Sequence, residues 1–187
     1  MHIIYFLLFF IYFFLLGRGI SIMIAKLSKK SILADEIKLF ETSVLIFYPL
    51  FGVIFFSNLV FISNFLLPLK NPIILIFCSI FIIFNFYNRF DFLKYKYIYL
   101  ISIINLSILS ISSYDINFQY DAGYYHLNYQ NWLREEKLIF GLNNLNAAFG
   151  TSSIIDYLSA PLWIGNNLIL LHYITIFFLV VLVNFLF

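Results

Sequence analysis

Long apolar runs alternate with short polar connections along most of this chain. Five runs are apolar enough to be candidate membrane-spanning helices, at residues 2–16, 43–62, 73–87, 97–111 and 167–187. A helix needs about 20 mainly apolar residues to cross a bilayer, and Tyr, Lys and Arg beside the third and fourth runs can lie at the membrane interface. The pattern therefore predicts an all-α fold, a polytopic transmembrane helical bundle with about five spans.

One long polar segment, residues 112–166, interrupts this pattern. It separates four predicted spans (1–111) from a fifth (167–187), and it holds more than half of the carboxylates in the chain. Within it, residues 121–137 predict an amphipathic helix that begins at Asp121, an acid suited to a first turn, and ends near Gly141. Residues 141–153 predict an ordered loop. Polar chemistry is therefore expected in this segment.

Composition agrees with a membrane protein. Hydrophobic residues make up 63% of the chain and charged residues 11%, against roughly 25% charged residues in soluble domains. A net charge of +2 without a dense basic stripe argues against a nucleic-acid partner. The single cysteine, Cys78, falls in an apolar run and is expected to pack as a small hydrophobe, and no His or Cys spacing predicts a metal site.

The positions of Lys and Arg predict an orientation. Five of them lie between residues 18 and 38 and three between 89 and 96, whereas the second connection offers only Lys70. Because excess positive charge marks the cytoplasmic side, the first and third connections are predicted to be cytoplasmic and the loop 112–166 extracytoplasmic. Arg18 is expected to follow the first span as part of this basic flank. The predicted location is the cell inner (cytoplasmic) membrane, as a multi-pass protein.

Two expectations concern the ends of the chain. The first apolar run lacks a basic segment before it, so we expect a retained anchor rather than a cleaved secretory signal. The sequence stops at Phe187 inside an apolar run, which suggests an N-terminal fragment of a longer polytopic protein or a truncated gene.

The predicted loop helix has one face that mixes a carboxylate, an amide and aromatic rings. At helical spacing this face comprises Asp121, Tyr125, Asn128 and Trp132. Such a surface suits a sugar, because aromatic rings pack on the apolar side of a pyranose and polar groups bind its hydroxyls. It suits an interfacial helix equally well, with Tyr124, Tyr125, Tyr129 and Trp132 as anchors at the lipid headgroups. Periodicity leaves both interpretations open.

The sequence of this segment resembles a known class of enzymes. The pattern Asp121-x-x-x-Tyr125-His126-Leu127, after a span and at the head of an outward-facing loop, is similar to a signature of bacterial GT-C-type integral-membrane glycosyltransferases. More narrowly, residues 120–153 resemble polysaccharide-locus membrane proteins. The further matching positions are Trp132, Leu133, Glu135, Gly141, Leu142, Asn144 and Leu145, and the departures are Tyr124, Asn146 and Ala148.

The resemblance implies a function and roles for individual residues. It implies transfer of a sugar from a polyprenyl-phosphate carrier to a glycan acceptor during cell-surface polysaccharide assembly, with Asp121 as general base. His126 would orient the acceptor or contact the donor phosphate, while Tyr125, Asn128 and Trp132 would shape the sugar site. Arg134 would meet the phosphate or, as its neighbours suggest, form a surface ion pair with Glu135 or Glu136. No cofactor is predicted, and a divalent metal at Asp121 would need ligands from further loops.

Two alternatives to an enzyme remain open at this stage. The chain could be a non-enzymatic membrane protein, such as a polysaccharide transport or scaffold subunit, whose loop helix only contacts membrane lipid. Ionisable residues within the spans would favour transport, and the predicted spans contain almost none. The chain could also be an inactive truncated product.

Overall fold

The computed structural model describes residues 2–27, 44–87, 96–111, 122–145, 147–151, 153–163 and 168–186, and every regular element in these ranges is helical. The all-α prediction is therefore confirmed for the described residues. Each of the predicted apolar runs forms helix. These elements, called the apolar helices below, are α1 (His2–Leu27), α3 (Val44–Asn64), α4 (Pro72–Ile80) with its 3-10 continuation η2 (Phe81–Tyr87), α5 (Lys96–Ile111) and α8 (Ile169–Leu186).

Two of the apolar helices are long and apolar enough to cross a membrane, by length and composition. They are the segments Ile3–Leu27 of α1 and Phe47–Asn64 of α3. Three shorter apolar helical segments accompany them, at Pro72–Phe86, Leu100–Ile111 and Leu170–Leu186. The helical character of all five runs is thus established, whereas a bundle of five spans stays a prediction.

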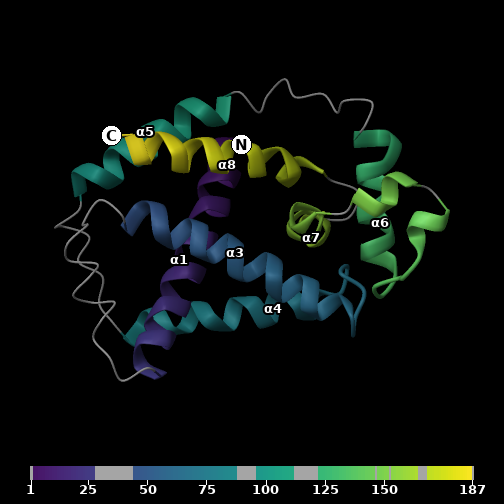
Figure 1. Ribbon diagram of the computed structural model, residues 1–187. Helices are drawn as coiled ribbons and strands as arrows, with labels where there is room; N and C mark the ends of the chain where they lie inside the picture. Colours follow the sequence, from purple (N-terminus) through teal and green to yellow (C-terminus); the bar gives the residue numbers. More distant parts are fainter. Residues whose placement is uncertain are drawn as a thin grey trace.

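Glycines allow the apolar helices to touch at their backbones. A Cβ atom placed on Gly17 of α1 would lie 1.9 Å from the Tyr48 carbonyl oxygen of α3, and one on Gly52 would lie 2.1 Å from the Phe13 carbonyl oxygen. Gly19 makes the same kind of approach to Phe81 of η2, at 2.1 Å from its carbonyl oxygen. Small residues at such crossings bring helices close enough for extensive van der Waals contact. Figure 1 shows α1 crossing α3 and the end of the helix in which η2 continues α4.

Aromatic rings fill the space where α1, α3 and α8 meet. Phe13 of α1 packs edge-on against Phe56 of α3 and Phe177 of α8, with ring centroids 5.5 and 5.7 Å apart. Phe9 and Tyr173 extend the cluster at 6.0 Å, also edge-on. Such edge-to-face pairs are the favoured aromatic geometry. Several of the many phenylalanines in the sequence therefore pack in the core between these helices.

Arg18 does not lie after the first span as predicted. The helix α1 continues to Leu27, and the Arg18 side chain is buried within it, with 6% of its surface exposed. Its Nη1 donates to the Asn85 Oδ1 of η2 at 2.9 Å, while the Asn85 Nδ2 donates to the Leu15 carbonyl oxygen at 2.8 Å. An amide partner inside the helix contact therefore lets this guanidinium remain within the apolar run.

The polar segment folds into short elements that we call the α6–α7 unit, comprising the described residues between 122 and 163. They are the π-helical turn η4 (Ala122–His126), α6 (Leu127–Glu135), the 3-10 turns η5 (Leu142–Asn144) and η6 (Ala147–Thr151), α7 (Ile154–Ser159) and the 3-10 turn η7 (Ala160–Leu162).

The predicted loop helix is present but shorter than expected. It ends at Glu135, because Glu136 turns to an extended conformation, and Gly141 does not terminate it. Gly141 instead adopts a left-handed conformation, with φ of 88°, at the start of the following 3-10 turn. Glycine adopts a left-handed conformation at little steric cost, which explains why a glycine lies at this turn. Gly141 therefore marks a turn, but the prediction that it ends the helix was wrong.

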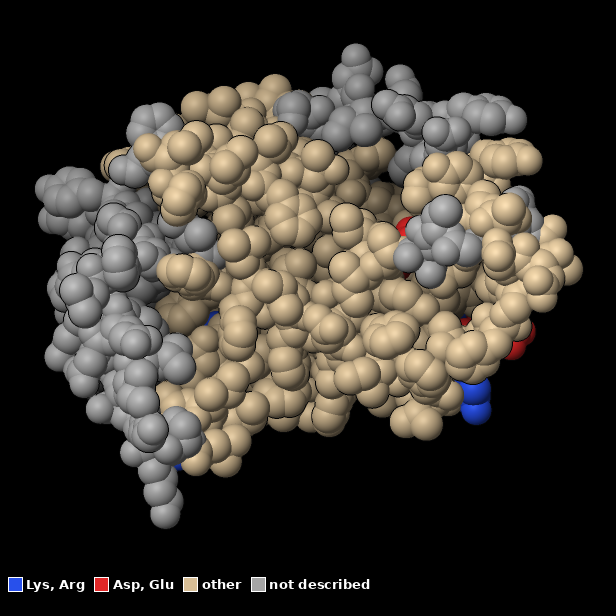
Figure 2. Space-filling model, in the orientation of Figure 1, with Lys and Arg blue, Asp and Glu red and all other residues tan. Residues whose placement is uncertain are grey.

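The α6–α7 unit is attached to the end of the apolar helices where α3 ends and α4 begins (Figure 1). The backbone N–H groups of Leu69 and Lys70 donate to the carbonyl oxygens of Leu133 and Arg134 at 3.0 and 3.2 Å. Asn64, which is fully buried, donates from Nδ2 to the Leu133 carbonyl oxygen at 3.2 Å. In Figure 2 most of the described surface is uncharged, and acidic atoms gather on the side of the molecule where α6 lies.

Candidate functional site

The helix α6 turns one side toward α7 and the other toward solvent. Gln130, Leu133 and Arg134 are buried, and His126, one turn before Gln130, lies on the same side. Asn128 and Trp132 are exposed on the other side. The buried side is unusual because it carries an imidazole, an amide and a guanidinium, so each of these groups needs a polar partner.

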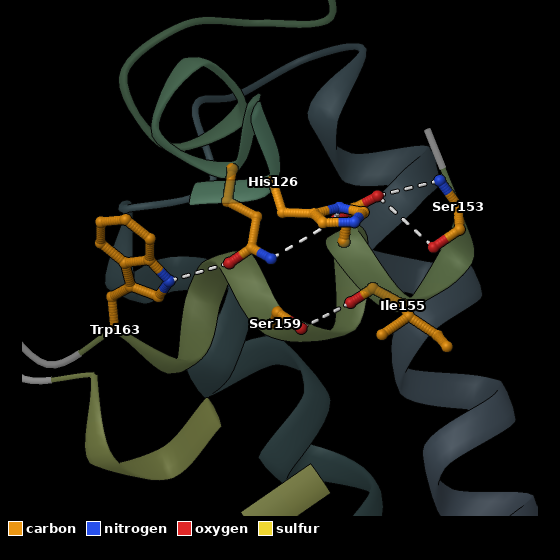
Figure 3. Close-up of polar contacts among 7 residues, drawn as sticks. His126, Ser153, Ile155, Ser159 and Trp163 are labelled. Carbon is orange, nitrogen blue, oxygen red and sulfur yellow. Dashed lines mark hydrogen bonds and ion pairs between the residues drawn. The ribbon is translucent and has the colours of Figure 1, made fainter. Parts of the chain in front are cut away.

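Asp156 of α7 is the centre of this polar cluster. Its side chain is buried, with 5% of its surface exposed, and it occupies the third position of α7. The Ser153 backbone N–H donates to Asp156 Oδ2 at 2.9 Å, and the Ser153 hydroxyl lies 3.4 Å from the same oxygen (Figure 3). This reciprocal capping box satisfies backbone donors at the helix start. One carboxylate oxygen is therefore committed to holding α7.

The other carboxylate oxygen faces α6. Gln130 Nε2 donates to Asp156 Oδ1 at 3.3 Å, and the Trp163 indole Nε1 donates to Gln130 Oε1 at 3.0 Å. Because an indole N–H can only donate, it requires the Gln130 oxygen on its own side and turns the amide nitrogen toward Asp156. Figure 3 shows this chain of bonds running from Trp163 through the amide to the carboxylate beside His126.

His126 approaches the same oxygen from the solvent side. Its Nδ1 lies 3.6 Å from Asp156 Oδ1, within ion-pair range and longer than a hydrogen bond. The His126 side chain is 44% exposed, so a nearly buried carboxylate stands behind a half-exposed imidazole. The ring of Tyr125 packs against the imidazole, with centroids 4.3 Å apart. This arrangement can orient an imidazole for proton transfer or hydrogen bonding to a ligand.

Arg134 holds the end of α7 and η7 in place. Its Nη1 donates to the carbonyl oxygens of Ala160 and Trp163 at 2.9 and 3.0 Å, and its guanidinium carbon lies 5.0 Å from the Trp163 ring centroid. Desolvation by burial lowers the pKa of Arg134 from its ordinary value, and the nearby Glu135 acts in the opposite direction.

The predicted surface ion pair of Arg134 with Glu135 or Glu136 is therefore wrong. The Arg134 side chain is buried because two backbone carbonyls and an indole ring replace its water shell. Glu135 instead forms an ion pair with Lys70, from the turn between α3 and α4. The two hydrogen bonds from Arg134 Nη1 support the end of α7 and η7, and the expected contact of Arg134 with a phosphate stays a prediction.

Two tyrosines complete the contact between α6 and α7. The hydroxyls of Tyr129 and Tyr157 lie 3.4 Å apart, and both side chains are buried. The Tyr157 ring packs edge-on against Phe61 of α3, with centroids 4.9 Å apart. Burial, and then the hydrogen bond with Tyr129, raises the pKa of Tyr157 above its ordinary value. This phenol therefore links the α6–α7 contact to the apolar helices.

The structure separates the predicted site residues into groups. His126 lies beside Asp156, and the ring of Tyr125 packs against the His126 ring. Asn128 and Trp132 are exposed on the other side of α6, and the Asn128 Nδ2 donates to the Tyr124 carbonyl oxygen at 2.9 Å within its own helix. Asp121, the predicted base, lies outside the described residues.

Asp156 and Gln130 were missed by sequence reasoning. The spacing Ser153-x-x-Asp156 is a signal for a helix start and could have located α7. Nothing in the sequence indicates that Asp156 faces His126, because the two residues are 30 positions apart and meet only through the packing of α6 on α7. Sequence therefore predicted the imidazole of this pair but not its carboxylate.

The described residues hold no group of three or more His, Cys, Asp or Glu side chains that could bind a metal ion. What they do hold is a partly exposed His–Asp pair braced by an amide and an indole. Comparisons with protein-family models, with curated proteins and with solved structures find no match to this chain.

Proposed function

We propose that this chain is a membrane-embedded glycosyltransferase, or part of one, that transfers a sugar from a polyprenyl-phosphate carrier to a glycan acceptor in surface-polysaccharide assembly. The observation that carries the proposal is the partly exposed pair that His126 forms with Asp156. His126 belongs to the motif that resembles GT-C-type enzymes, and the fold adds the carboxylate of Asp156 to it. Charged atoms are few on the face that Figure 2 draws, and the acidic atoms visible there lie on the side of the molecule that holds α6. A lipid-carried sugar needs an apolar surface for its polyprenyl chain and polar groups for its sugar hydroxyls.

The exposed surfaces of the apolar helices support a place in the bilayer. Large apolar side chains face outward on α1, α3, α4, α5 and α8, among them Leu8, Ile54, Ile76, Ile108 and Leu182. Water would penalise so much exposed apolar surface, whereas lipid tails would not. The proposed five-span arrangement uses the two long helices together with the three shorter segments.

The proposed orientation is supported by one contact between distant parts of the chain. The second connection, residues 65–71, hydrogen-bonds to the end of α6 through Leu69 and Lys70. Charge asymmetry predicts that this connection and the loop 112–166 face the same side of the membrane, away from the cytoplasm. Their direct contact agrees with that topology.

In the proposed reaction Asp121 takes the proton of the acceptor hydroxyl as that oxygen attacks the anomeric carbon and the carrier phosphate leaves. His126 and Tyr125 contact the sugar beside it, and Asn128 and Trp132 offer a second surface to the glycan. The alternative use of Trp132, as an anchor at the lipid headgroups, is favoured by its exposure together with that of Tyr124 and Phe140. A headgroup anchor and a glycosyltransferase site are compatible on one loop.

The catalytic assignment is tested by Asp121→Asn in the organism that carries this gene, with surface polysaccharide measured at equal protein level. A general base contributes about a hundredfold or more to a reaction rate, so we expect polysaccharide to fall to background. Asp115→Asn, in the same predicted loop, is the matched control and should retain wild-type amounts. Wild-type polysaccharide from Asp121→Asn would refute the role of Asp121.

The orientation is tested by single cysteines placed in a Cys78→Ser background and labelled with an impermeant maleimide. Asn143 is exposed in the α6–α7 unit and Lys26 is exposed near the end of α1. We expect Asn143→Cys to react in intact cells and Lys26→Cys to react only after permeabilisation. The reverse pattern would place the site on the cytoplasmic side and would exclude transfer on the outer face.

A further inference from the structure

We propose that Asp156 is a positioning residue that holds the neutral imidazole of His126 in the tautomer with its proton on Nδ1, so that Nε2 accepts a hydrogen bond from a sugar hydroxyl. The contacts that support this proposal join His126, Asp156, Gln130 and Ser153, all of them described residues. The identity of the ligand as a sugar rests on the proposed function. In this state His126 binds the acceptor hydroxyl and not the donor phosphate.

The carboxylate is fixed independently of His126. Ser153 binds its Oδ2 through the capping box, and Gln130 binds its Oδ1. Gln130 is itself fixed because the Trp163 indole N–H demands the amide oxygen. Ser153 and Gln130 both donate to Asp156, so both carboxylate oxygens act as hydrogen-bond acceptors. A side chain held in this way does not rotate to suit the imidazole.

The position of the proton on the His126 ring is therefore set by the fixed carboxylate. With Nδ1 at 3.6 Å from Asp156 Oδ1, the neutral ring gains most when Nδ1 carries the proton, since the other tautomer would set two acceptors against each other. Among the described residues, the titratable groups near this contact include Tyr125 and Tyr129 on the same helix and Tyr157 beside Asp156. Arg134 directs its Nη1 to the carbonyl oxygens of Ala160 and Trp163 instead.

The consequence lies at Nε2. In the Nδ1–H tautomer this nitrogen has a lone pair and no proton, so it can accept from a hydroxyl and cannot donate to a phosphate oxygen. In glycosyl transfer the acceptor oxygen forms a bond to the anomeric carbon, the bond from that carbon to the phosphate oxygen breaks, and the phosphate leaves with the electron pair. His126 Nε2 would orient the attacking hydroxyl before its proton passes to the base.

Nitrogen-15 NMR of the full chain, labelled at histidine and held in lipid nanodiscs, measures the tautomer directly. The chain has three histidines, and the signals of His126 are those lost in His126→Gln. At about pH 8.5, where a free imidazole is neutral, we expect the proton on Nδ1. A His126 ring with its proton on Nε2, or on both nitrogens, would overturn the proposal.

Asp156→Asn should reverse the tautomer without removing the capping contact. The Ser153 backbone N–H has the shorter bond to the carboxylate, so we expect it to retain the remaining oxygen of Asn. The new NH2 group then faces His126 and Gln130, and the hydrogen bond from Gln130 is lost. Nδ1 then faces an N–H group in place of a buried carboxylate oxygen, so the electrostatic attraction for a proton on Nδ1 is lost. We expect the ratio of Nδ1–H to Nε2–H to fall about tenfold, which corresponds to about 1.4 kcal/mol. An unchanged ratio would also overturn the proposal.

Gln130→Leu is the matched control, because it disturbs the same cluster but leaves the Asp156 carboxylate facing His126. It should keep the wild-type tautomer, and a reversal as large as that in Asp156→Asn would show that general loosening, not Asp156, sets the tautomer. Polysaccharide assembly then separates the two proposals. A reversed tautomer with wild-type polysaccharide in Asp156→Asn refutes the positioning role, whereas wild-type polysaccharide in Asp121→Asn refutes the proposed catalytic base.

Discussion

The apolar helices and the α6–α7 unit hold their partners by different kinds of contact. Where α1 crosses α3, glycines let backbone touch backbone, and phenylalanine rings close the surrounding space. Where α6 meets α7 and the end of α3, single polar side chains reach backbone carbonyls, as Arg134 and Asn64 do. The first kind of contact depends on the absence of side-chain volume, and the second depends on particular donors.

This difference predicts how each region responds to substitution. Apolar contacts between helices tolerate exchange of one apolar residue for another of similar volume, and they fail when volume is added at a glycine. Polar contacts in the α6–α7 unit fail when a donor is removed, because a buried carbonyl is then left without a partner. The following substitutions test the comparison, in order of decreasing expected effect.

Gly17→Ala should have the largest effect on stability. Its new methyl group would lie 1.9 Å from the Tyr48 carbonyl oxygen and 2.7 Å from the Gly52 nitrogen, both of them backbone atoms. We expect the free energy of unfolding, measured by SDS titration in mixed micelles, to fall by more than about 3 kcal/mol. Gly123→Ala is the control, because nothing lies within 4 Å of a Cβ atom there. Equal effects of the two variants would contradict the glycine contact.

Arg134→Met should release the end of α7. The carbonyl oxygens of Ala160 and Trp163 lose a charged donor inside a buried contact, at a cost of about 3 kcal/mol. Lys137→Met, at an exposed position after the same helix, should change the free energy of unfolding by less than about 0.5 kcal/mol. If Arg134→Met lost polysaccharide assembly at unchanged stability, Arg134 would serve the substrate as the resemblance implies.

Asn64→Ala should weaken the attachment of α6 to α3. Its Nδ2 lies within hydrogen-bonding distance of the carbonyl oxygens of Leu67, Leu133 and Glu136, at 3.3, 3.2 and 3.2 Å. We expect a loss of about 2 kcal/mol, together with faster proteolysis of the α6–α7 unit. Asn58→Ala removes an exposed amide from the same helix and is the control. Proteolysis at the wild-type rate in Asn64→Ala would argue against this attachment.

Tyr157→Phe should have the smallest effect, visible at alkaline pH. Burial raises the pKa of Tyr157, so the folded protein holds the phenol proton more tightly than the unfolded chain does. The resulting stability is fully present below the unfolded pKa of about 10 and is lost above it, by at most about 1.4 kcal/mol per pH unit. Unfolding followed between pH 9 and about 11.5 should show a shallower loss in Tyr157→Phe than in the exposed control Tyr124→Phe.

The sequence predicted helices best where hydrophobicity alone decides them. Each apolar run became a helix, because backbone groups in an apolar setting must bond within their own segment. Prediction from sequence was wrong about helix boundaries that depend on contacts between distant segments. Arg18 lies inside α1 because Asn85 of η2 meets it there, and α6 ends at Glu135 where the turn before α4 supplies backbone donors.

The candidate site divides in the same way. The helical class, the apolar runs and the polar segment that holds Tyr125 and His126 could all be predicted from the amino-acid sequence, because they follow from local composition and spacing. The packing of helices brings His126 against Asp156, places Gln130 and Trp163 where they hold that carboxylate, and turns Arg134 toward α7. These pairings join residues far apart in sequence, and a buried polar group accepts whichever partner the packing of helices brings within bonding distance.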